Sequence, residues 1–257
     1  MLEVRHLDKY YNPGTISELC LFSDFNLIVE DGEFLCVVGS NGSGKTSLLN
    51  LIGGNLSLDG GGIFFHGEDI TKQKDFLRHR RIGRVYQNPG AGTCPGMSIL
   101  ENMSLADNKG KHYGLGRGIN KQRIPYYKEL LSGLNLGLQD KLDGKVSSLS
   151  GGQRQVLALL MATMNPIEFL ILDEHTAALD PKTAELVMEL TQKIVNEKQV
   201  TTIMVTHNLR YAVDYGSRLI MMHQGNIILD KGKKEKAGLK VEDILGTFNE
   251  ISIECGN

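Results

Sequence analysis

The sequence predicts an α/β fold whose core is a mixed sheet, and the order of its apolar segments supports this prediction. Three continuous apolar runs are typical of parallel strands buried on both faces, and they lie at 33–39, 168–173 and 200–206. Three segments carry apolar residues at helical spacing, at 44–52, 151–164 and 180–197. Strands that alternate with helices imply right-handed crossovers and a parallel sheet.

Further strands are expected near both ends of the chain. Segments 2–7 and 19–32 are rich in strand-forming residues, and the turn sequence Asn12–Thr15 separates them. They predict an antiparallel β subdomain. Segments 218–223 and 226–232 predict two more strands after the last buried run.

Segment 90–144 is richer in Gly, Lys, Asn and Tyr than its surroundings and contains two predicted helices, at 98–105 and 121–134. The sequence therefore predicts one domain with three parts. These are an α/β core with its antiparallel β subdomain at 1–89 and 145–235, an inserted helical subdomain at 90–144, and a short C-terminal helix within 236–257.

Composition limits the possible functions. The 257 residues carry a formal net charge of −2, which argues against a general nucleic-acid-binding surface. The four cysteines form no CxxC pair, so free thiols are favoured over disulfides or a zinc site. Two short basic clusters, 78–81 and 231–236, are expected to be solvated faces, with contact to acidic lipid or a partner as the alternative. No apolar run approaches 18 residues, so any membrane-spanning segment is expected to belong to a partner.

A glycine-rich loop between a strand and a helix predicts a phosphate-binding site. Residues 39–46 match G-x-x-x-x-G-K-[ST] at every fixed position. Glycine allows successive N–H groups to point into one concavity, and the following helix adds its positive N-terminal end. Lys45 would contact the β- and γ-phosphates and Thr46 would ligate Mg²⁺. The predicted nucleotide contacts here are Gly39, Ser40, Asn41, Gly42, Ser43, Gly44, Lys45, Thr46 and Ser47.

Two carboxylates follow the apolar run at 169–172. The carboxyl ends of parallel strands face the ligand crevice, which places Asp173 and Glu174 at such an edge. Asp173 is predicted to reach magnesium through a bound water or another ligand, and Glu174 to be the general base that activates water. Taken alone, the pair could also be an ordinary acidic end of a strand.

The sequence Leu-Ser-Gly-Gly-Gln at 149–153 opens a second predicted helix with an anion-binding N-terminus. One nucleotide does not need two such termini from one chain. Ser150, Gly151, Gly152 and Gln153 are therefore predicted to contact a nucleotide held by a second copy.

With these motifs in order, the chain resembles the ATP-binding subunits of ABC transporters, which have a P-loop NTPase fold, over nearly its whole length. By this resemblance, Tyr11 stacks on adenine, although the neighbouring Tyr10 could do so instead. Gln87 matches the glutamine that contacts the metal site and reports nucleotide state to a partner. Asp180, within the segment 177–180, matches the family's D-loop and is a predicted nucleotide contact, and His207 matches the histidine at the γ-phosphate.

The helix after Asp180 has its own sequence signals. Asp180 is a predicted N-cap and Pro181 the first helical residue. Its apolar stripe is expected to comprise Leu186, Val187, Leu190 and Ile194.

Two positions depart from the family pattern. His175 stands where proline is usual, and Met161 stands where arginine is frequent. Several stretches more closely resemble ATPases of small-solute uptake systems with tryptophan- or tyrosine-type binding proteins.

The resemblance implies an ATP- and Mg²⁺-dependent ATPase that drives an importer of an amino-acid-like solute. Two copies would sandwich two ATP molecules head to tail, as a homodimer in the simpler case. Further expected partners are integral membrane permease subunits and an extracytoplasmic substrate-binding protein, with no nucleic acid, and the expected place is the cytoplasmic face of the cell membrane. The alternative is a soluble ATPase that drives an assembly process, such as building an iron–sulfur scaffold.

Overall fold

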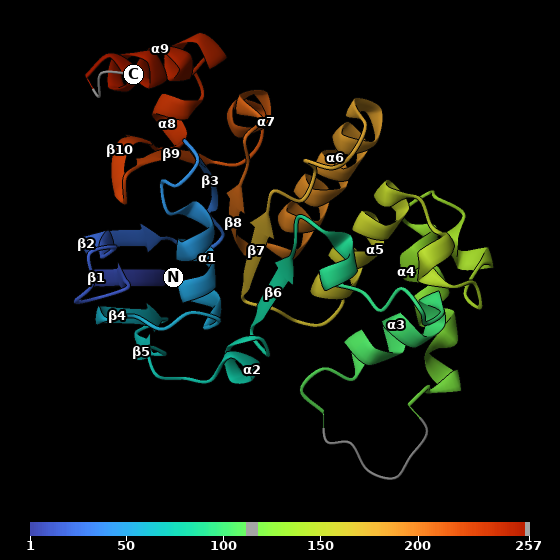
Figure 1. Ribbon diagram of the computed structural model, residues 1–257. Coiled ribbons are helices and arrows are strands. Elements are labelled where there is room, and N and C mark those ends of the chain that lie inside the picture. Colours follow the sequence, from blue (N-terminus) through green and yellow to red (C-terminus); the bar gives the residue numbers. More distant parts are fainter. Residues whose placement is uncertain (112–117, 255–257) are drawn as a thin grey trace. The chain divides into compact units, whose positions relative to one another are not determined.

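The computed structural model describes residues 1–111 and 118–254 (Figure 1). Side chains are described as far as residue 249. The chain divides into two compact units: unit 1 comprises Met1–Gln73 and Thr201–Asn257, and unit 2 comprises Lys74–Val200. Part of the expected helical subdomain, 112–117, and Cys255 lie outside the described residues.

Unit 1 contains a four-stranded antiparallel sheet in the order β2-β1-β4-β5. Strand β1 (Leu2–Tyr11) pairs with β2 (Leu19–Val29) and β4 (Gly60–Phe65), and β4 pairs with β5 (Glu68–Asp69). The predicted antiparallel strands are therefore confirmed. Strand β4 was not predicted, because it begins with three glycines, which are not typical of strands. A Cβ at Gly61 would lie 2.1 Å from the His6 carbonyl oxygen, so the close approach to β1 requires glycine there.

The second group of strands in unit 1 carries the phosphate loop. Strand β3 (Phe34–Gly39) lies between β8 (Thr201–Val205) and β9 (Arg218–His223) and is parallel to both, whereas β10 (Asn226–Lys231) is antiparallel to β9. All six residues of β3 and all five of β8 are buried, as their continuous apolar sequences predict. Unit 1 also contains helices α1 (Lys45–Gly53), α7 (Leu209–Asp214), α8 (Lys233–Lys236) and α9 (Val241–Glu254).

Unit 2 contains a parallel strand pair and most of the helices. Strand β6 (Ile82–Val85) pairs in parallel with β7 (Phe169–Asp173), with Arg84 opposite Ile171. The short helix α2 (Asp75–Arg78) precedes β6. Strand β6 was not predicted, because its four residues include a glycine and an arginine. A Cβ at Gly83 would lie 2.6 Å from the Ala162 carbonyl oxygen, so glycine allows β6 to pack closely against α5 (Gly151–Thr163).

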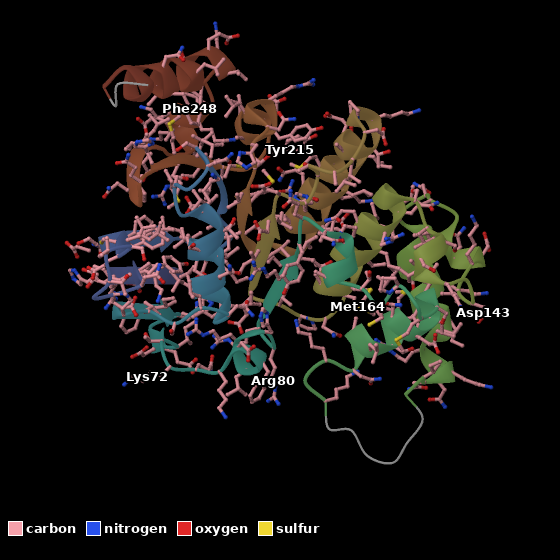
Figure 2. All side chains as sticks on the ribbon, in the orientation of Figure 1. Lys72, Arg80, Asp143, Met164, Tyr215 and Phe248 are labelled. Atoms are coloured by element: carbon pink, nitrogen blue, oxygen red, sulfur yellow. The ribbon has the colours of Figure 1, made fainter. Side chains whose placement is uncertain are left out.

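Unit 2 contains helices α3 (Ile99–Asp107), α4 (Ile124–Ser132) and α5 (Figure 1), and apolar side chains of all three belong to one buried cluster. The predicted helices at 98–105 and 121–134 are thus confirmed. Met103 and Leu131 are fully buried in this cluster, and Met164, labelled in Figure 2, is the C-cap of α5. A capping box at Ser98 fixes the start of α3, because its side chain accepts from the Glu101 N–H and the Glu101 carboxylate accepts from the Ser98 N–H.

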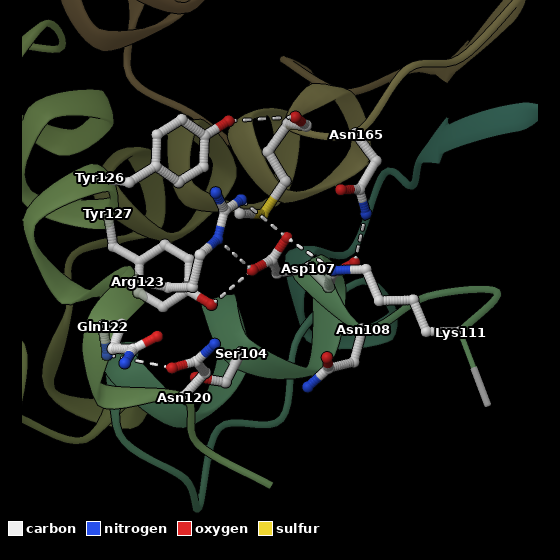
Figure 3. A network of polar contacts seen from close by, with 12 residues as sticks. Ser104, Asp107, Asn108, Lys111, Asn120, Gln122, Arg123, Tyr126, Tyr127 and Asn165 are labelled. Atoms are coloured by element: carbon white, nitrogen blue, oxygen red, sulfur yellow. Dashed lines mark hydrogen bonds and ion pairs between the residues drawn. The ribbon is translucent and has the colours of Figure 1, made fainter. Parts of the chain in front are cut away.

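A buried carboxylate connects α3 to α4 (Figure 3). Asp107 Oδ2 accepts hydrogen bonds from Arg123 Nε at 2.8 Å and from the Tyr127 hydroxyl at 2.8 Å. Lys111 Nζ lies 3.3 Å from Oδ1. These donors, with Arg123 as the largest contributor, hold the pKa of Asp107 at about 2. The network provides the charge compensation that a buried carboxylate needs.

Helix α6 (Pro181–Lys198) begins as the sequence predicts, since the Asp180 side chain caps the Thr183 N–H at 3.1 Å and Pro181 is the first helical residue. Its buried face differs from the predicted stripe. Only Val187 of the four predicted residues is fully buried. The buried residues of this helix are Ala184, Val187, Met188, Thr191 and Val195. The shift brings a polar residue, Thr191, into the interior.

The expectation that both basic clusters are solvated faces is wrong for one residue in each. Arg78 is 2 % exposed and Lys236 is 6 % exposed. Lys236 Nζ donates to the carbonyl oxygens of Val213 and Gly216, at 2.8 and 3.1 Å, and to that of Tyr215, which is labelled in Figure 2. The lysine therefore binds carbonyl groups at the end of α7, where a cation is favoured.

In the described part of the chain, no helix combines the length and apolar character needed to cross a bilayer. Three of the four cysteines are described, and each is a free thiol.

Candidate functional site

The loop between β3 and α1 is held in shape by its own lysine. Lys45 is 5 % exposed, and its Nζ donates to the carbonyl oxygens of Gly39 at 2.9 Å and Ser40 at 2.8 Å. It also lies 3.3 Å from Ser43 Oγ. The ammonium group is thus fixed inside the curl of the loop, next to the N-terminus of α1. This arrangement is suited to binding phosphate.

Two loop glycines are required by the backbone. Gly44, the N-cap of α1, has φ 101°, and a Cβ there would lie 2.7 Å from the Phe22 ring. Gly39 has φ 152°, and a Cβ there would lie 2.2 Å from the Met222 carbonyl oxygen. Both conformations exclude larger residues. Thr46 and Asn41 are exposed, so the hydroxyl predicted to ligate magnesium is accessible.

Tyr11 lies beside the phosphate loop. Its hydroxyl oxygen is 3.2 Å from Ser47 Oγ in the first turn of α1, and Lys9 Nζ lies 5.7 Å from the centre of its ring. Tyr10 is instead close to Cys20 and Asp8, whose charges raise the pKa of its hydroxyl. Of the two tyrosines, Tyr11 is therefore the one whose hydroxyl contacts the helix that follows the loop.

His207 lies at the carboxyl end of β8, where the sequence analysis expects ligand-facing groups. It is exposed. The next residue, Asn208, caps the short helix α7 by accepting from the Tyr211 N–H at 3.3 Å. Tyr11, the phosphate loop and His207 all belong to unit 1.

The carboxylates at the end of β7 belong to unit 2 and have contrasting surroundings. Asp173 Oδ2 accepts from Arg84 Nη2 at 3.1 Å. Glu174 is half-buried and has φ 48°, in the left-handed region that is uncommon for a residue other than glycine. This sharp turn after β7 orients Glu174 differently from the strand residues before it.

Arg84, the partner of Asp173, was not among the predicted site residues. Arg84 lies three residues before Gln87, which was predicted as a site residue. Its pairing with Asp173 could be expected only if the segment before Gln87 was recognised as a strand beside β7. Gln87 itself is exposed, just after β6.

The second predicted anion site is the N-terminus of α5. Ser150 is exposed and forms a capping box, with its Oγ accepting from the Gln153 N–H at 3.2 Å and Gln153 Oε1 accepting from the Ser150 N–H at 3.1 Å. A Cβ at Gly152 would lie 2.0 Å from Thr183 Cγ2, so Gly152 allows α5 to approach the first turn of α6. The predicted signature residues and Asp180 are therefore joined by packing within unit 2.

His175 occupies a buried position immediately after Glu174. It is 2 % exposed, and its Nε2 lies 3.2 Å from Thr191 Oγ1 in α6. The Thr191 hydroxyl donates to the Val187 carbonyl oxygen at 2.7 Å, so the histidine is the donor to Thr191. Burial lowers the pKa of His175 to about 4. Met161 is half-buried and packs on the apolar cluster around α5.

The predicted metal ligands Thr46, Gln87 and Asp173 offer a hydroxyl, an amide and a carboxylate oxygen. These hard oxygen donors suit Mg²⁺, which needs few protein ligands and retains water or phosphate oxygens. The described residues contain no group of three or more His, Cys, Asp or Glu side chains that could hold a metal.

The family model described as ABC transporter matches residues 22–177. The chain belongs to the ABC transporter family. A tyrosine transport ATP-binding protein of Clostridioides difficile is 47% identical over 253 residues, covering 96% of this chain and 98% of that protein. A spermidine/putrescine import ATP-binding protein of Haemophilus influenzae is 32% identical over 257 residues, covering 97% of this chain and 63% of that protein.

Solved structures agree with this assignment. A dimeric ATP-binding cassette in a post-hydrolysis state, bound to ADP and Pi, matches with a TM-score of 0.76 and 28% identity, covering 91% of this chain and 99% of that one. The α/β fold of the ABC ATPase type predicted from the sequence is confirmed. This ABC chain is an ATP-binding subunit that hydrolyses ATP, as its sequence resemblance implied.

Proposed function

We propose that this ABC ATPase powers the import of a small, amino-acid-like solute. The observation that carries the proposal is its 47% identity to a tyrosine transport ATP-binding protein over almost the full length of both chains. The import function of the spermidine/putrescine relative points in the same direction. The chain would work at the cytoplasmic face of the cell membrane, attached through permease subunits and supplied by an extracytoplasmic substrate-binding protein.

The proposed nucleotide contacts divide between the two units. In unit 1, the buried Lys45 and the N-terminus of α1 would bind phosphate, and Tyr11 would stack on adenine. The contact between Tyr11 and Ser47 supports this choice over Tyr10. His207 would hydrogen-bond the γ-phosphate from the end of β8.

In unit 2, Glu174 is the proposed general base. Its half-buried position and its left-handed backbone after β7 are typical of residues held in place for function. Asp173 and Gln87, with Thr46 of unit 1, are the proposed contacts of magnesium. When bound, magnesium would neutralise phosphate charge.

A second copy of the chain is the proposed partner at the γ-phosphate. Helix α5 has 13 residues, and its N-terminus provides N–H groups and a positive dipole for an anion. Ser150, Gly151, Gly152 and Gln153 would therefore contact the nucleotide of the other copy, with Asp180 nearby in the packing of α5 against α6. ATP would favour the closed head-to-tail pair and hydrolysis the open one.

Permease coupling has a candidate surface within unit 2. A mainly apolar cavity of about 500 Å³ lies along α3 and the start of α4, and its lining includes Leu100, Leu105, Ile119 and Ile124. Leu105 is 42% exposed, so apolar surface is accessible at this cavity. The cavity would receive apolar side chains of a permease helix.

Two measurements test the proposed function. The tagged chain is purified from detergent-solubilised membranes of its own cell, and the same cells are assayed for uptake of labelled tyrosine and tryptophan. We expect two integral membrane subunits to co-purify, and uptake to be lost in a Glu174→Gln strain that keeps normal protein levels. Co-purification of soluble assembly factors alone, with normal uptake, would instead favour the assembly ATPase, which the comparisons do not favour.

A further inference from the structure

The position of Arg84 follows from the pairing of β6 with β7. Arg84 lies opposite Ile171 in the parallel register. Side chains two residues apart on a strand share a face, so Asp173 lies on the same face as Ile171 and Arg84. A diagonal neighbour at this separation is within reach of a long side chain such as arginine.

Arg84 and Asp173 form a nearly buried ion pair. Arg84 Nη2 lies 3.1 Å from Asp173 Oδ2, and the two side chains are 5% and 12% exposed. Arginine remains protonated in proteins, so the guanidinium charge is permanent. Little solvent is available to screen the interaction between these charges.

Neighbouring groups fix the guanidinium in place. It lies over the Tyr86 ring, 4.7 Å from the ring centre. The Tyr86 carbonyl oxygen in turn accepts from Nε2 of the fully buried Gln155, at 3.1 Å. Gln155 belongs to α5, so the surroundings of Arg84 include β7 through Asp173 and, by way of Tyr86, α5.

We propose that Arg84 is an internal counter-cation for Asp173, against which a divalent metal ion at this carboxylate must compete. The inference rests on the proposed assignment of Asp173 to magnesium. The guanidinium already compensates the carboxylate charge and repels a second cation placed nearby. The pair therefore lowers metal affinity while it stabilises the protein without metal.

Removal of the Arg84 charge should have the opposite effect on metal affinity. A buried carboxylate that loses its cationic partner is destabilising, and a bound dication restores the compensation. A variant without the guanidinium charge should therefore bind metal more tightly and should gain more thermal stability from metal than the wild type does. A purely structural role for Arg84 predicts lower stability but no gain in metal affinity.

The same two strands provide a matched control. Arg81 Nε lies 2.6 Å from Glu168 Oε1, just before β6 and β7, and these side chains are 28% and 43% exposed. This pair resembles the first in chemistry but lies at the opposite ends of the strands, away from Asp173. Arg81→Gln should leave metal affinity unchanged.

The test measures Mn²⁺ binding by electron paramagnetic resonance, with protein in excess over the slow analogue AMP-PNP. Arg84→Gln keeps a hydrogen-bond donor but removes the charge, and it should lower the half-saturating Mn²⁺ concentration by about tenfold, an order of magnitude for one nearby charge. Arg84→Lys keeps the charge and should bind Mn²⁺ as the wild type does. Unchanged or weaker Mn²⁺ binding in a folded Arg84→Gln protein overturns the proposal.

Asp173→Asn separates the two levels of the inference. If Asp173→Asn leaves Mn²⁺ affinity unchanged, the assignment of Asp173 to the metal fails, and the counter-cation proposal fails with it. If Asp173→Asn weakens Mn²⁺ binding but Arg84→Gln does not strengthen it, only the role of Arg84 is wrong. If Arg84→Gln folds poorly, Arg84→Met is used instead, and the increase in its melting temperature on adding Mg²⁺ and AMP-PNP is measured. This increase should exceed that of the wild type. An equal or smaller increase overturns the proposal.

Discussion

The phosphate loop of unit 1 and the carboxylate end of β7 in unit 2 each contain a charged side chain with a proposed role, Lys45 at the phosphates and Asp173 at magnesium, and the two are stabilised in different ways. Lys45 donates to carbonyl oxygens of its own loop, which carry no net charge. Asp173 is paired with the full positive charge of Arg84, which lies 89 positions away in the sequence. Backbone groups close in the sequence therefore help to hold Lys45 in place, whereas Asp173 is held by a side chain from a distant strand.

The phosphate loop is therefore a site formed mainly by backbone groups, and the carboxylate end of β7 is a site formed mainly by side chains. Glycines and a helix N-terminus shape the loop, so an added Cβ should harm it most. The carboxylate end depends on individual side chains and their partners, so isosteric changes should harm it most. The following predictions test this distinction.

The largest expected effect is on turnover at the carboxylate end. Glu174→Gln preserves shape but removes the proposed base, and steady-state ATP hydrolysis should fall by about 10²- to 10⁴-fold, the usual contribution of a general base. ATP affinity, measured by equilibrium binding, should stay near the wild-type value. Turnover within a few-fold of wild type would remove Glu174 from this role.

In the phosphate loop, the position of an added Cβ should decide the outcome. Gly39→Ala places the Cβ 2.2 Å from a backbone oxygen, and we expect a loss of about 3 kcal/mol or more in unfolding free energy, with loss of ATP binding. Gly42→Ala, at φ 78° with nothing within 4 Å, should cost only about 1–2 kcal/mol. Urea unfolding measures both variants, and equal costs would contradict a loop limited by close contact.

A similar pair lies at the start of α5. Gly152→Ala would place a Cβ 2.0 Å from the Thr183 side chain and should cost about 1–3 kcal/mol. Gly151→Ala meets only Leu179 Cδ2 at 3.5 Å and should change stability by less than about 0.5 kcal/mol. Thermal unfolding measures the stability of both variants. A loss for Gly151→Ala as large as that for Gly152→Ala would contradict the close packing of α5 on α6.

The smallest expected effect is a pH dependence from His175. Burial lowers its pKa to about 4, so the folded protein binds fewer protons than the unfolded chain between that value and the ordinary pKa of about 6.5. Stability is therefore complete above about pH 6.5 and falls with decreasing pH, by about 1 kcal/mol between pH 7.5 and 5.5. His175→Gln should lack this part of the pH dependence, and an unchanged slope would show that other groups cause it.

The parts of the structure that were predicted from the sequence are determined by residues close together in the chain. The strand–loop–helix around Lys45, the cap at Asp180 and the antiparallel pair β1 and β2 all follow from residues close together in the chain. The same holds for the assignment to the ABC family, because its motifs are short and contiguous.

The parts that were missed depend on contacts between distant residues. Strands β4 and β6 contain glycines that are explained only by the neighbouring backbone at His6 and Ala162. The buried face of α6 includes Thr191 because His175 lies against it. Likewise, Arg84 becomes part of the site only when β6 pairs with β7.

The central claim of the proposed mechanism is that the N-terminus of α5, at Ser150 of one copy, contacts the nucleotide bound by another copy. Light scattering of the Glu174→Gln protein with ATP and Mg²⁺ tests it, with the Glu174→Gln, Ser150→Arg double variant as the control. We predict a dimer for the first and a monomer, with ATP still bound, for the second. A double variant that dimerises as well as Glu174→Gln would contradict the account.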